Sequence, residues 1–220
     1  MNVYLEWSYK PVKGKQTIVF RSDYYPVTSI LALVDDIEKT GRVKELLFVD
    51  EEGCQWSKKE IMKYIKGVED EPHDIIVHFD GGFDHATSNA GLGIAIQFKQ
   101  NNKTYRIRKN ERIHNIQTNN EAEYAALWFA LSELEALGAH HIPIMIKGDS
   151  LVVINQLTEE WPCYEPELQQ WVDRIEGKVK ELGFQAQFQA VSRKQNKEAD
   201  QLATQALEGT EISSKRTVEE

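Results

Sequence analysis

Four carboxylates occupy positions where strands are expected to end or helices to begin. Asp80 and Asp149 each follow a short apolar run typical of a buried strand. Glu123 and Asp200 lie in the first turns of two expected helices. Strand ends and helix starts of one sheet can converge, so we expect the four acids to lie together. Their mutual repulsion would be relieved by hard divalent cations such as Mg²⁺ or Mn²⁺, which prefer oxygen ligands. Two such ions about 4 Å apart bind the attacking water and the leaving oxygen of a phosphodiester.

Two acids in one expected helix compete for a place in this cluster. Glu121 and Glu123 are separated by roughly 200° of helical rotation, so only one of them can face the site. Glu123 shares a helical face with Leu127 and Ala130, whereas the other acid points away from that face. We therefore assign Glu123 to the cluster. Each acid alone is a weak signal in a chain with 35 Asp and Glu residues, but the set of four is far stronger.

The residues that follow Asp80 allow two interpretations of that acid. Gly81 and Gly82 let the backbone approach a ligand or a neighbouring strand closely. Turn-forming residues come next, so Asp80 taken alone is equally well explained as a turn residue that closes a hairpin. Only its combination with the other three acids favours a site.

The elements that carry these acids form an α/β pattern between residues 75 and 208. Strands are expected at Ile75–Phe79, Gly91–Phe98, Lys103–Lys109, Ile142–Ile146 and Phe184–Val191. Helices are expected from Thr118 to Leu137 and at Leu151–Leu157, Glu165–Leu182 and Asn196–Leu207. The order βββαβααβα predicts a mixed five-stranded sheet flanked by helices. Residues 209–220 are expected to form a flexible tail.

Residues 1–70 are expected to form a separate, small α+β domain with the order ββαββα. Thr28 or Ser29 is expected to cap its first helix, and Ser57 with Glu60 fits a capping box for the second. The acidic run Glu69–Asp74 is the predicted boundary between the two domains.

Aromatic and cationic side chains lie close together near the start of the chain. Trp7 and Tyr9 precede Lys10, Lys13 and Lys15, which fall in an expected turn between two strands. Such aromatics can stack on bases while the cations hold phosphates. We instead expect Trp7 and Tyr9 to belong to the core of a small sheet. The role of this domain is left open between a protein partner and a nucleic-acid partner.

Composition restricts the possible functions. The chain has 26 Lys and Arg residues against 35 Asp and Glu, a net charge of −9. This argues against a general polyanion binder, because affinity for phosphate backbones grows with cationic contacts, and a nucleic-acid enzyme would need a local basic strip. No apolar run is long enough to cross a bilayer, no signal-peptide pattern is present, and Cys54 and Cys163 match no metal or redox spacing. We therefore expect a cytoplasmic protein with reduced thiols and no membrane association.

Four short motifs together resemble one enzyme family. They are Asp80-Gly81-Gly82, Thr118-Asn119-Asn120-Glu121-Ala122-Glu123, Gly148-Asp149-Ser150 and Asn196-Lys197-Glu198-Ala199-Asp200. The region from about Ile75 to Leu207 resembles ribonuclease H type 1, and within it the bacterial and archaeal branch that lacks a long basic protrusion and is often labelled reverse-transcriptase-like. The resemblance implies a ribonuclease H-like fold.

The resemblance also implies a reaction and a role for each acid. It implies cleavage of the RNA strand of RNA·DNA hybrids, with two Mg²⁺ ions (Mn²⁺ as an alternative) and with 3′-hydroxyl and 5′-phosphate products. Asp80 would bridge both metals, Asp200 would complete the nucleophile-side site, and Glu123 with Asp149 would complete the leaving-group side. Glu123 would also sense a ribose 2′-hydroxyl. We interpret the glycines after Asp80 as clearance for the nucleic-acid backbone. The expected substrate contacts are Gly81, Gly82, Asn119, Asn120, Ser150, Arg193, Lys194 and Asn196.

The sequence departs from the family pattern in two loops. Ala190–Gln195 has no histidine where many family members carry one, and Arg193 or Lys194 is a candidate phosphate contact there instead. The segment Thr158–Glu165 is acidic, where relatives often present lysines to the DNA strand, so we expect low and salt-sensitive affinity for hybrids. Trp161 and Tyr164 in this segment either stack on sugars or pack against the sheet, and we expect them to pack.

Two other functions are consistent with parts of the sequence. A non-catalytic adaptor would keep the fold and hold a partner through residues 1–68, which suits the acidic surface but leaves the four acids unexplained. A 3′-exonuclease of the same superfold usually begins with Asp-x-Glu, and Asp80-Gly81-Gly82 lacks that glutamate. The leading interpretation is therefore a metal-dependent ribonuclease.

Overall fold

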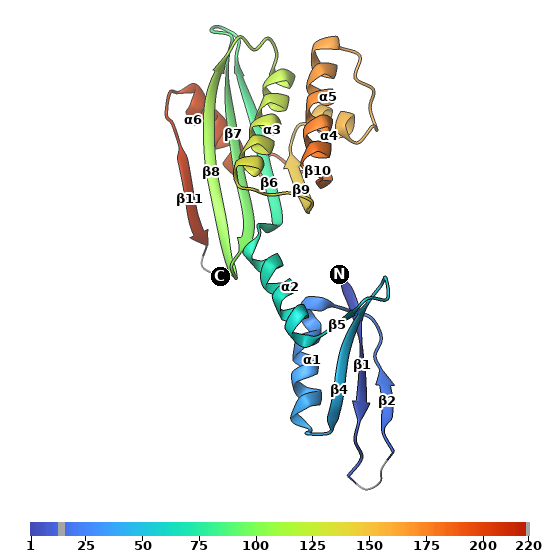
Figure 1. The fold of residues 1–220 in the computed structure, drawn as a ribbon. Helices are drawn as coiled ribbons and strands as arrows, with labels where there is room; N and C mark the ends of the chain where they lie inside the picture. Colours follow the sequence, from blue (N-terminus) through green and yellow to red (C-terminus); the bar gives the residue numbers. More distant parts are fainter. Residues whose placement is uncertain (13–15, 219–220) are drawn as a thin grey trace. The chain divides into compact units, whose positions relative to one another are not determined.

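The strand β6 (His73–Asp84) is one of the two middle strands of the larger sheet (Figure 1). It carries Asp80 in its interior. The prediction that Asp80 ends a strand and precedes a turn was wrong. Gly81 and Gly82 continue the antiparallel ladder with β7 (Asn89–Gln100) as far as Asp84. The turn comes only after Asp84, so Asp80 lies within the ladder that β6 forms with β7.

The structure is a computed structural model and describes residues 1–12 and 16–218. The chain divides into two units, Met1–Val68 and Glu69–Glu220, and each unit has its own hydrophobic core. Lys13 and Lys15, which were expected in a turn, lie outside the described residues.

The second unit is built on one mixed sheet of six strands in the order β10-β9-β6-β7-β8-β11. The strands β6, β7 and β8 form an antiparallel meander, and β9 and β10 extend the sheet in parallel from β6. The bounds of the strands not yet given are Lys103–His114 for β8, Pro143–Gly148 for β9, Gln185–Ala190 for β10 and Ser213–Val218 for β11. The prediction of a mixed sheet flanked by helices is confirmed.

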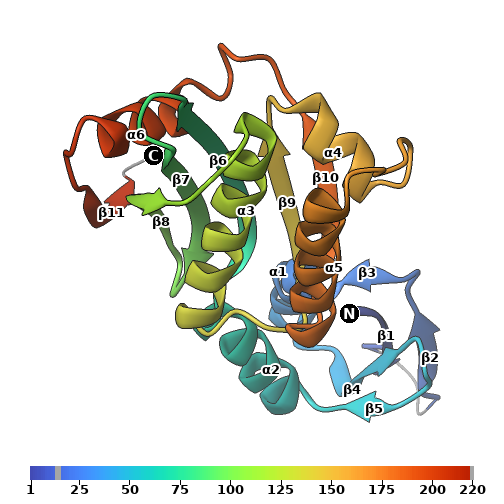
Figure 2. The ribbon, with the colours of Figure 1, turned by 90° about the horizontal axis from the view of Figure 1, so that it is seen from above.

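Helices cover both faces of this sheet (Figure 2). Helix α3 (Asn119–Ala136) packs against β6, β7 and α5 (Pro166–Glu181) on one face, where the main hydrophobic core lies. Helix α6 (Lys197–Leu207) packs on the other face, against β6, β7 and β8. The short α4 (Leu151–Leu157) follows β9.

The strand β11 was expected to be part of a flexible tail, and for Ser213–Val218 that prediction was wrong. This segment pairs with β8 in antiparallel register and adds a sixth strand to the sheet that was predicted to have five. Asn110 on β8 holds the approach to this strand, because its side-chain amide donates to the carbonyls of Leu202 and Thr210 and its Oδ1 accepts from the Ile212 N–H. The strand is polar, so its sequence carries no apolar strand signal.

The first unit consists of a five-stranded sheet and two helices. Its elements are β1 (Asn2–Tyr9), β2 (Ile18–Arg21), β3 (Tyr25–Pro26), α1 (Val27–Lys39), β4 (Val43–Asp50), β5 (Gln55–Trp56) and α2 (Lys58–Asp70). The strand β1 lies at the centre and pairs antiparallel with β2, β3 and β4.

The helix starts in this unit differ in how they are capped. Ser57 and Glu60 form the expected reciprocal capping box at α2, with the Ser57 N–H donating to Glu60 Oε2 at 2.7 Å. The expected cap of α1 at Thr28 or Ser29 was wrong. Helix α1 starts earlier, after Pro26, and has no side-chain cap. Among the helices of the described residues, none has the length and apolar character needed to span a bilayer.

Candidate active site

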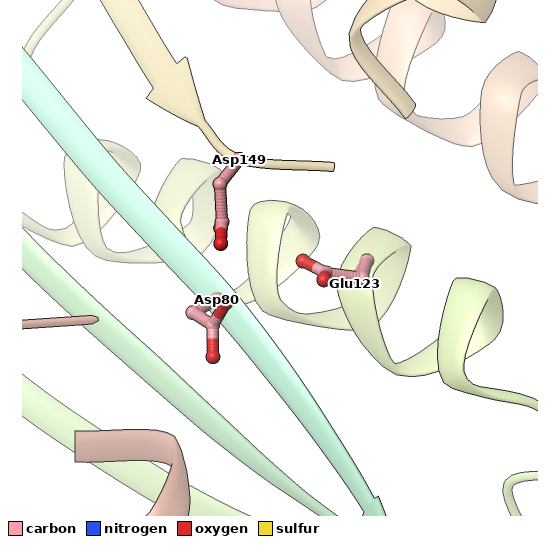
Figure 3. Close-up of side chains that lie close together, drawn as sticks. All are labelled: Asp80, Glu123 and Asp149. Carbon is pink, nitrogen blue, oxygen red and sulfur yellow. The ribbon is translucent and has the colours of Figure 1, made fainter. Parts of the chain in front are cut away.

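Three of the four predicted acids converge where β9 ends beside β6 (Figure 3). Asp80 comes from β6, Glu123 from α3 and Asp149 from the residue after β9. One carboxylate oxygen from each lies within 4.8 Å of those from the other two. Three carboxylates at this spacing fit a hard divalent cation, since Mg²⁺ and Mn²⁺ take oxygen ligands at about 2 Å.

Strand alternation brings Asp80 toward one face and its neighbour toward the other. A Cβ at Gly81 would meet α3, and a Cβ at Gly82 would meet Leu207 of α6, so odd and even positions of β6 face opposite helices. Asp80 therefore faces the α6 side, while Glu123 reaches it from α3 over the backbone of Gly81. The acids meet at the end of β9, where the parallel strand stops and leaves the edge of β6 open beyond it.

Gly81 is the residue that lets α3 come this close. A Cβ at this position would lie 2.3 Å from the carbonyl carbon of Ala122 and 2.4 Å from the backbone nitrogen of Glu123. The Gly81 N–H also donates to Glu123 Oε2 at 3.3 Å. Close approach of a helix, rather than clearance for a nucleic acid, thus explains the glycine. A Cβ at Gly82 would likewise lie 3.1 Å from Leu207 Cδ1.

Asn196 positions Asp149. Its side-chain nitrogen donates to Asp149 Oδ1 at 2.7 Å and to the carbonyl oxygen of Phe79 at 2.9 Å. The residue is 1% exposed, so the prediction that it contacts substrate was wrong. Sequence reasoning missed this positioning role. The one signal in the sequence was an asparagine at the start of α6, whose side chain proves not to cap that helix.

Asp200, the fourth predicted acid, lies in the first turn of α6. Its Oδ1 is 3.6 Å from a guanidinium nitrogen of Arg193, and its charge acts on Asp80. It is not among the three acids whose oxygens meet within 4.8 Å. The structure thus places a triad of Asp80, Glu123 and Asp149 at the centre with Asp200 beside it.

Burial and mutual repulsion raise the proton affinity of two of these acids. Burial, with the charges of Asp149 and Asp200, raises the pKa of Asp80 to about 7. Burial, with the charges of Asp80 and Asp149, raises the pKa of Glu123 to about 9, although the Gly81 N–H opposes this. Both causes favour the neutral acid when no cation is present. Carboxyl groups whose pKa is raised by burial and by neighbouring charges are common in metal-binding and catalytic sites.

Glu121 has a separate, structural task. Its carboxylate accepts from the Gln117 N–H at 2.8 Å and from Trp171 Nε1 at 3.4 Å, so it ties the start of α3 to α5. Glu123, in contrast, is 7% exposed and faces the triad's other two acids. The structure therefore orients the two acids as the helical wheel predicts.

The remaining predicted substrate contacts differ in exposure and in the elements that carry them. Asn119 is exposed and Asn120 half-buried in the first turn of α3. Ser150 caps α4, with its Oγ accepting from the Val153 N–H. Arg193 and Lys194 are exposed in the loop before α6. Their contacts with a substrate remain predictions.

The loop between α4 and α5 presents its aromatic residues to solvent. Tyr164 is 86% exposed and Trp161 is 46% exposed, so the prediction that they pack against the sheet was wrong. Cys163, between them, packs against the core instead and its thiol points to the Glu165 carbonyl. Stacking on a ligand is the alternative that the exposure favours.

This fold and this acidic cluster define a ribonuclease H type 1-like protein. Residues 78–206 match the family model described as reverse transcriptase-like, and the chain belongs to this family. YpeP, an uncharacterized protein of Bacillus subtilis (strain 168), is 42% identical over 196 residues, covering 89% of this chain and 86% of the relative. Ribonuclease HI of Halobacterium salinarum is 37% identical over 92 residues, covering 41% of this chain and 44% of the relative.

Solved structures agree with this assignment. The crystal structure of RNase H1 from Halobacterium salinarum NRC-1 aligns with a TM-score of 0.53 at 28% identity, covering 62% of this chain and 98% of that chain. The crystal structure of LC11-RNase H1 in complex with an RNA/DNA hybrid aligns with a TM-score of 0.56 at 27% identity, with the same coverage of 62% and 98%.

Proposed function

We propose that the protein is a metal-dependent endoribonuclease that hydrolyses the RNA strand of RNA·DNA hybrids. One observation carries the proposal: three carboxylates from β6, α3 and the end of β9 bring oxygens within 4.8 Å of one another in a chain of this family. Two of them are buried in a way that stabilises their protonated forms. A divalent cation is the ligand that would let all three be ionised together.

Asp80, Glu123 and Asp149 would hold Mg²⁺ or Mn²⁺, with Asp200 completing a second ion site beside Asp80. When bound, such ions activate water and stabilise the leaving oxygen of a phosphodiester. The chain itself supplies the rigidity: Asp80 is held in a sheet ladder, and Asn196 fixes Asp149. Glu123 is fixed by the Gly81 N–H.

Support for a hybrid as the substrate comes from the relatives. A solved neighbour at 27% identity is described in complex with an RNA/DNA hybrid, and a curated relative is described as a ribonuclease HI. The first turn of α3 presents Asn119 and Asn120 beside Glu123, where amide groups suit minor-groove and 2′-hydroxyl contacts. The exposed aromatics of the α4–α5 loop, Trp161 and Tyr164, would stack on sugars or bases.

The test compares end-labelled hybrid, duplex RNA, single-stranded RNA and single-stranded DNA at low salt, with Mg²⁺, with Mn²⁺ and with a chelator. We expect internal cleavage of the RNA strand in the hybrid alone, only with metal. Two substitutions in one helix form a matched pair: Glu123→Gln should reduce the rate by at least about 10²-fold, and Glu121→Gln should leave it within about threefold. If the hybrid is not cleaved with either metal, the proposed nuclease activity is wrong and the protein keeps the fold without catalysis.

A further inference from the structure

The α6-facing side of the six-stranded sheet carries a row of cations in a unit that is otherwise acidic. Residues 69–220 contain 15 Lys and Arg against 25 Asp and Glu, a net charge of −10. Helix α6 covers this side of the sheet near Gly82, Gly91 and Gly93. Further along the strands, Gln97 and Arg106 on the same side are exposed.

Strand register places the side chains of this face in two parallel rows across the sheet. One row crosses β10, β9, β6, β7, β8 and β11 through Gln189, Lys147, His78, Ala95, Arg108 and Ser214. The next row crosses the same strands through Gln187, Met145, Ile76, Gln97, Arg106 and Arg216. Neither row contains a carboxylate. The cationic face consists of the four cations of these rows, Lys147, Arg106, Arg108 and Arg216.

The carboxylates nearest to these rows leave the face with net positive charge. Glu198 of α6 pairs with both Arg106 and Arg108, with 2.9 Å between its Oε1 and Nε of Arg108. Lys147 and Arg216 have no ion-pair partner within the part of the chain that the structure describes. With Glu198 counted, the two rows have a net charge of +3, and the carboxylates of Asp80 and Asp149 follow two residues further along the chain from His78 and Lys147.

The cationic face begins at the candidate active site. Lys147 lies two residues before Asp149 and on the same side of β9, as His78 lies two residues before Asp80 on β6. Two residues along a strand correspond to about 7 Å. From β9 to β11 the face then crosses four strand spacings, roughly 19 Å, which matches about six nucleotides at 3.4 Å each.

We propose that the cationic face binds the sugar-phosphate backbone of the nucleic acid that the triad cleaves, about one to six nucleotides away from the scissile phosphate. The proposal rests on the proposed function for the identity of the ligand. The cationic face supplies the local basic strip that this acidic chain needs to bind a nucleic acid. Its positive charge is complementary to the phosphates, and its side chains lie on an exposed part of the sheet. Glutamines beside the cations add donors and acceptors for phosphate and sugar oxygens.

The test measures how salt weakens binding of a labelled RNA·DNA hybrid to the full chain. Asp80→Asn serves as the host so that the hybrid stays intact, and fluorescence anisotropy gives Kd from 50 to 300 mM KCl. Adding Lys147→Gln and Arg216→Gln, which leave the Glu198 pairs untouched, should reduce the slope of log Kd against log[KCl] by roughly 2, since each phosphate that is no longer neutralised removes about 0.9 from the slope. The matched control adds Lys103→Gln and Lys180→Gln, two exposed cations outside the face, and should keep the host's slope.

The outcomes separate this proposal from the proposed function. Equal slopes in the face variant and the host overturn the proposal even if the parent cleaves hybrids. A reduced slope with no cleavage by the parent supports the face and contradicts the nuclease. Removing about six base pairs from the end of the hybrid that reaches the cationic face should make the salt slopes of the host and the face variant equal. Self-association at low salt that the two glutamine substitutions abolish, with unchanged hybrid binding, would assign the face to a second copy and overturn the proposal.

Discussion

At the scale of single residues, the candidate site stores unfavourable electrostatic energy. Asp80 and Glu123 are both buried, and each faces at least one other acid of the cluster. The fold therefore keeps protons on these groups that the unfolded chain would release. A bound cation or a neutral substitution should relieve this electrostatic repulsion. Because the folded state holds these protons more tightly than the unfolded state, the stability of the protein should depend on pH.

The pKa of Asp80 is raised to about 7 from 3.8, so the folded state binds its proton more tightly than the unfolded state does. The contribution of this proton to stability in the metal-free protein is then fully present below about pH 4 and is lost as pH rises toward 7, and the contribution of Glu123, with a pKa of about 9, is lost over a range that extends to that pH. At about 1.4 kcal/mol per pH unit for each group, the two raised pKa values set an upper bound of roughly 7 kcal/mol on the loss between pH 5 and 8. Asp80→Asn should remove much of this slope and be the more stable protein at pH 8.

Urea unfolding in chelator at several pH values measures this slope. Glu121→Gln, an amide substitution outside the triad, is the control that should retain the parent's slope. Parallel curves for the parent and Asp80→Asn would contradict the assignment of raised proton affinity to this cluster.

Asn196 offers a second prediction at this scale. Asn196→Ala removes the donors to Asp149 and to the Phe79 carbonyl, leaving buried acceptors unpaired at a cost of about 1–3 kcal/mol. Losing this support should also raise the Mg²⁺ concentration for half-maximal cleavage by about 10- to 100-fold. Gln201→Ala, an exposed position of the same helix, should change neither quantity. A stability loss without a shift in the metal requirement would show that Asn196 supports the fold alone.

At the scale of elements, the site depends on how closely α3 approaches β6. Gly81→Ala would place a Cβ against the backbone of Ala122, which cannot move without shifting the helix that carries Glu123. We expect a loss of about 1–3 kcal/mol or more, with cleavage impaired beyond what the stability loss explains. Gly177→Ala in α5 has open space around it and should be neutral or stabilising by up to about 1 kcal/mol. Thermal unfolding and hybrid cleavage of the two variants provide the comparison.

The same elements show which features the sequence could predict. The apolar periods of the strands and helices indicated a mixed sheet flanked by helices, because burial imposes those periods directly. Gly81 and Gly82 were misleading, since glycine suits both a turn and a helix contact, and only the position of α3 decides between them. The strand β11 was missed because a polar strand bound by Asn110 and backbone pairing has no apolar pattern. Asn196 was misassigned because its burial arises from tertiary packing.

At the scale of the whole molecule, charge is divided unequally between the two units. Residues 1–68 contain 11 Lys and Arg against 10 Asp and Glu, a net charge of +1, whereas residues 69–220 have a net charge of −10. The acidic unit holds the candidate metal site, and the two hydrophobic clusters share no residue. Metal binding should therefore raise the unfolding temperature of the second unit alone.

Calorimetry of the full chain tests this division. A metal that binds the folded site at about 100 times its Kd stabilises the second unit by about 2.7 kcal/mol, which shifts its unfolding temperature upward by roughly 5–10 °C. The transition of residues 1–68 should stay in place, because the triad lies wholly in the other unit. Asp80→Asn should remove most of the Mg²⁺-dependent shift while keeping both transitions. If metal shifts both transitions by the same amount, the two units unfold as one. If Asp80→Asn keeps the whole Mg²⁺-dependent shift, the metal binds elsewhere.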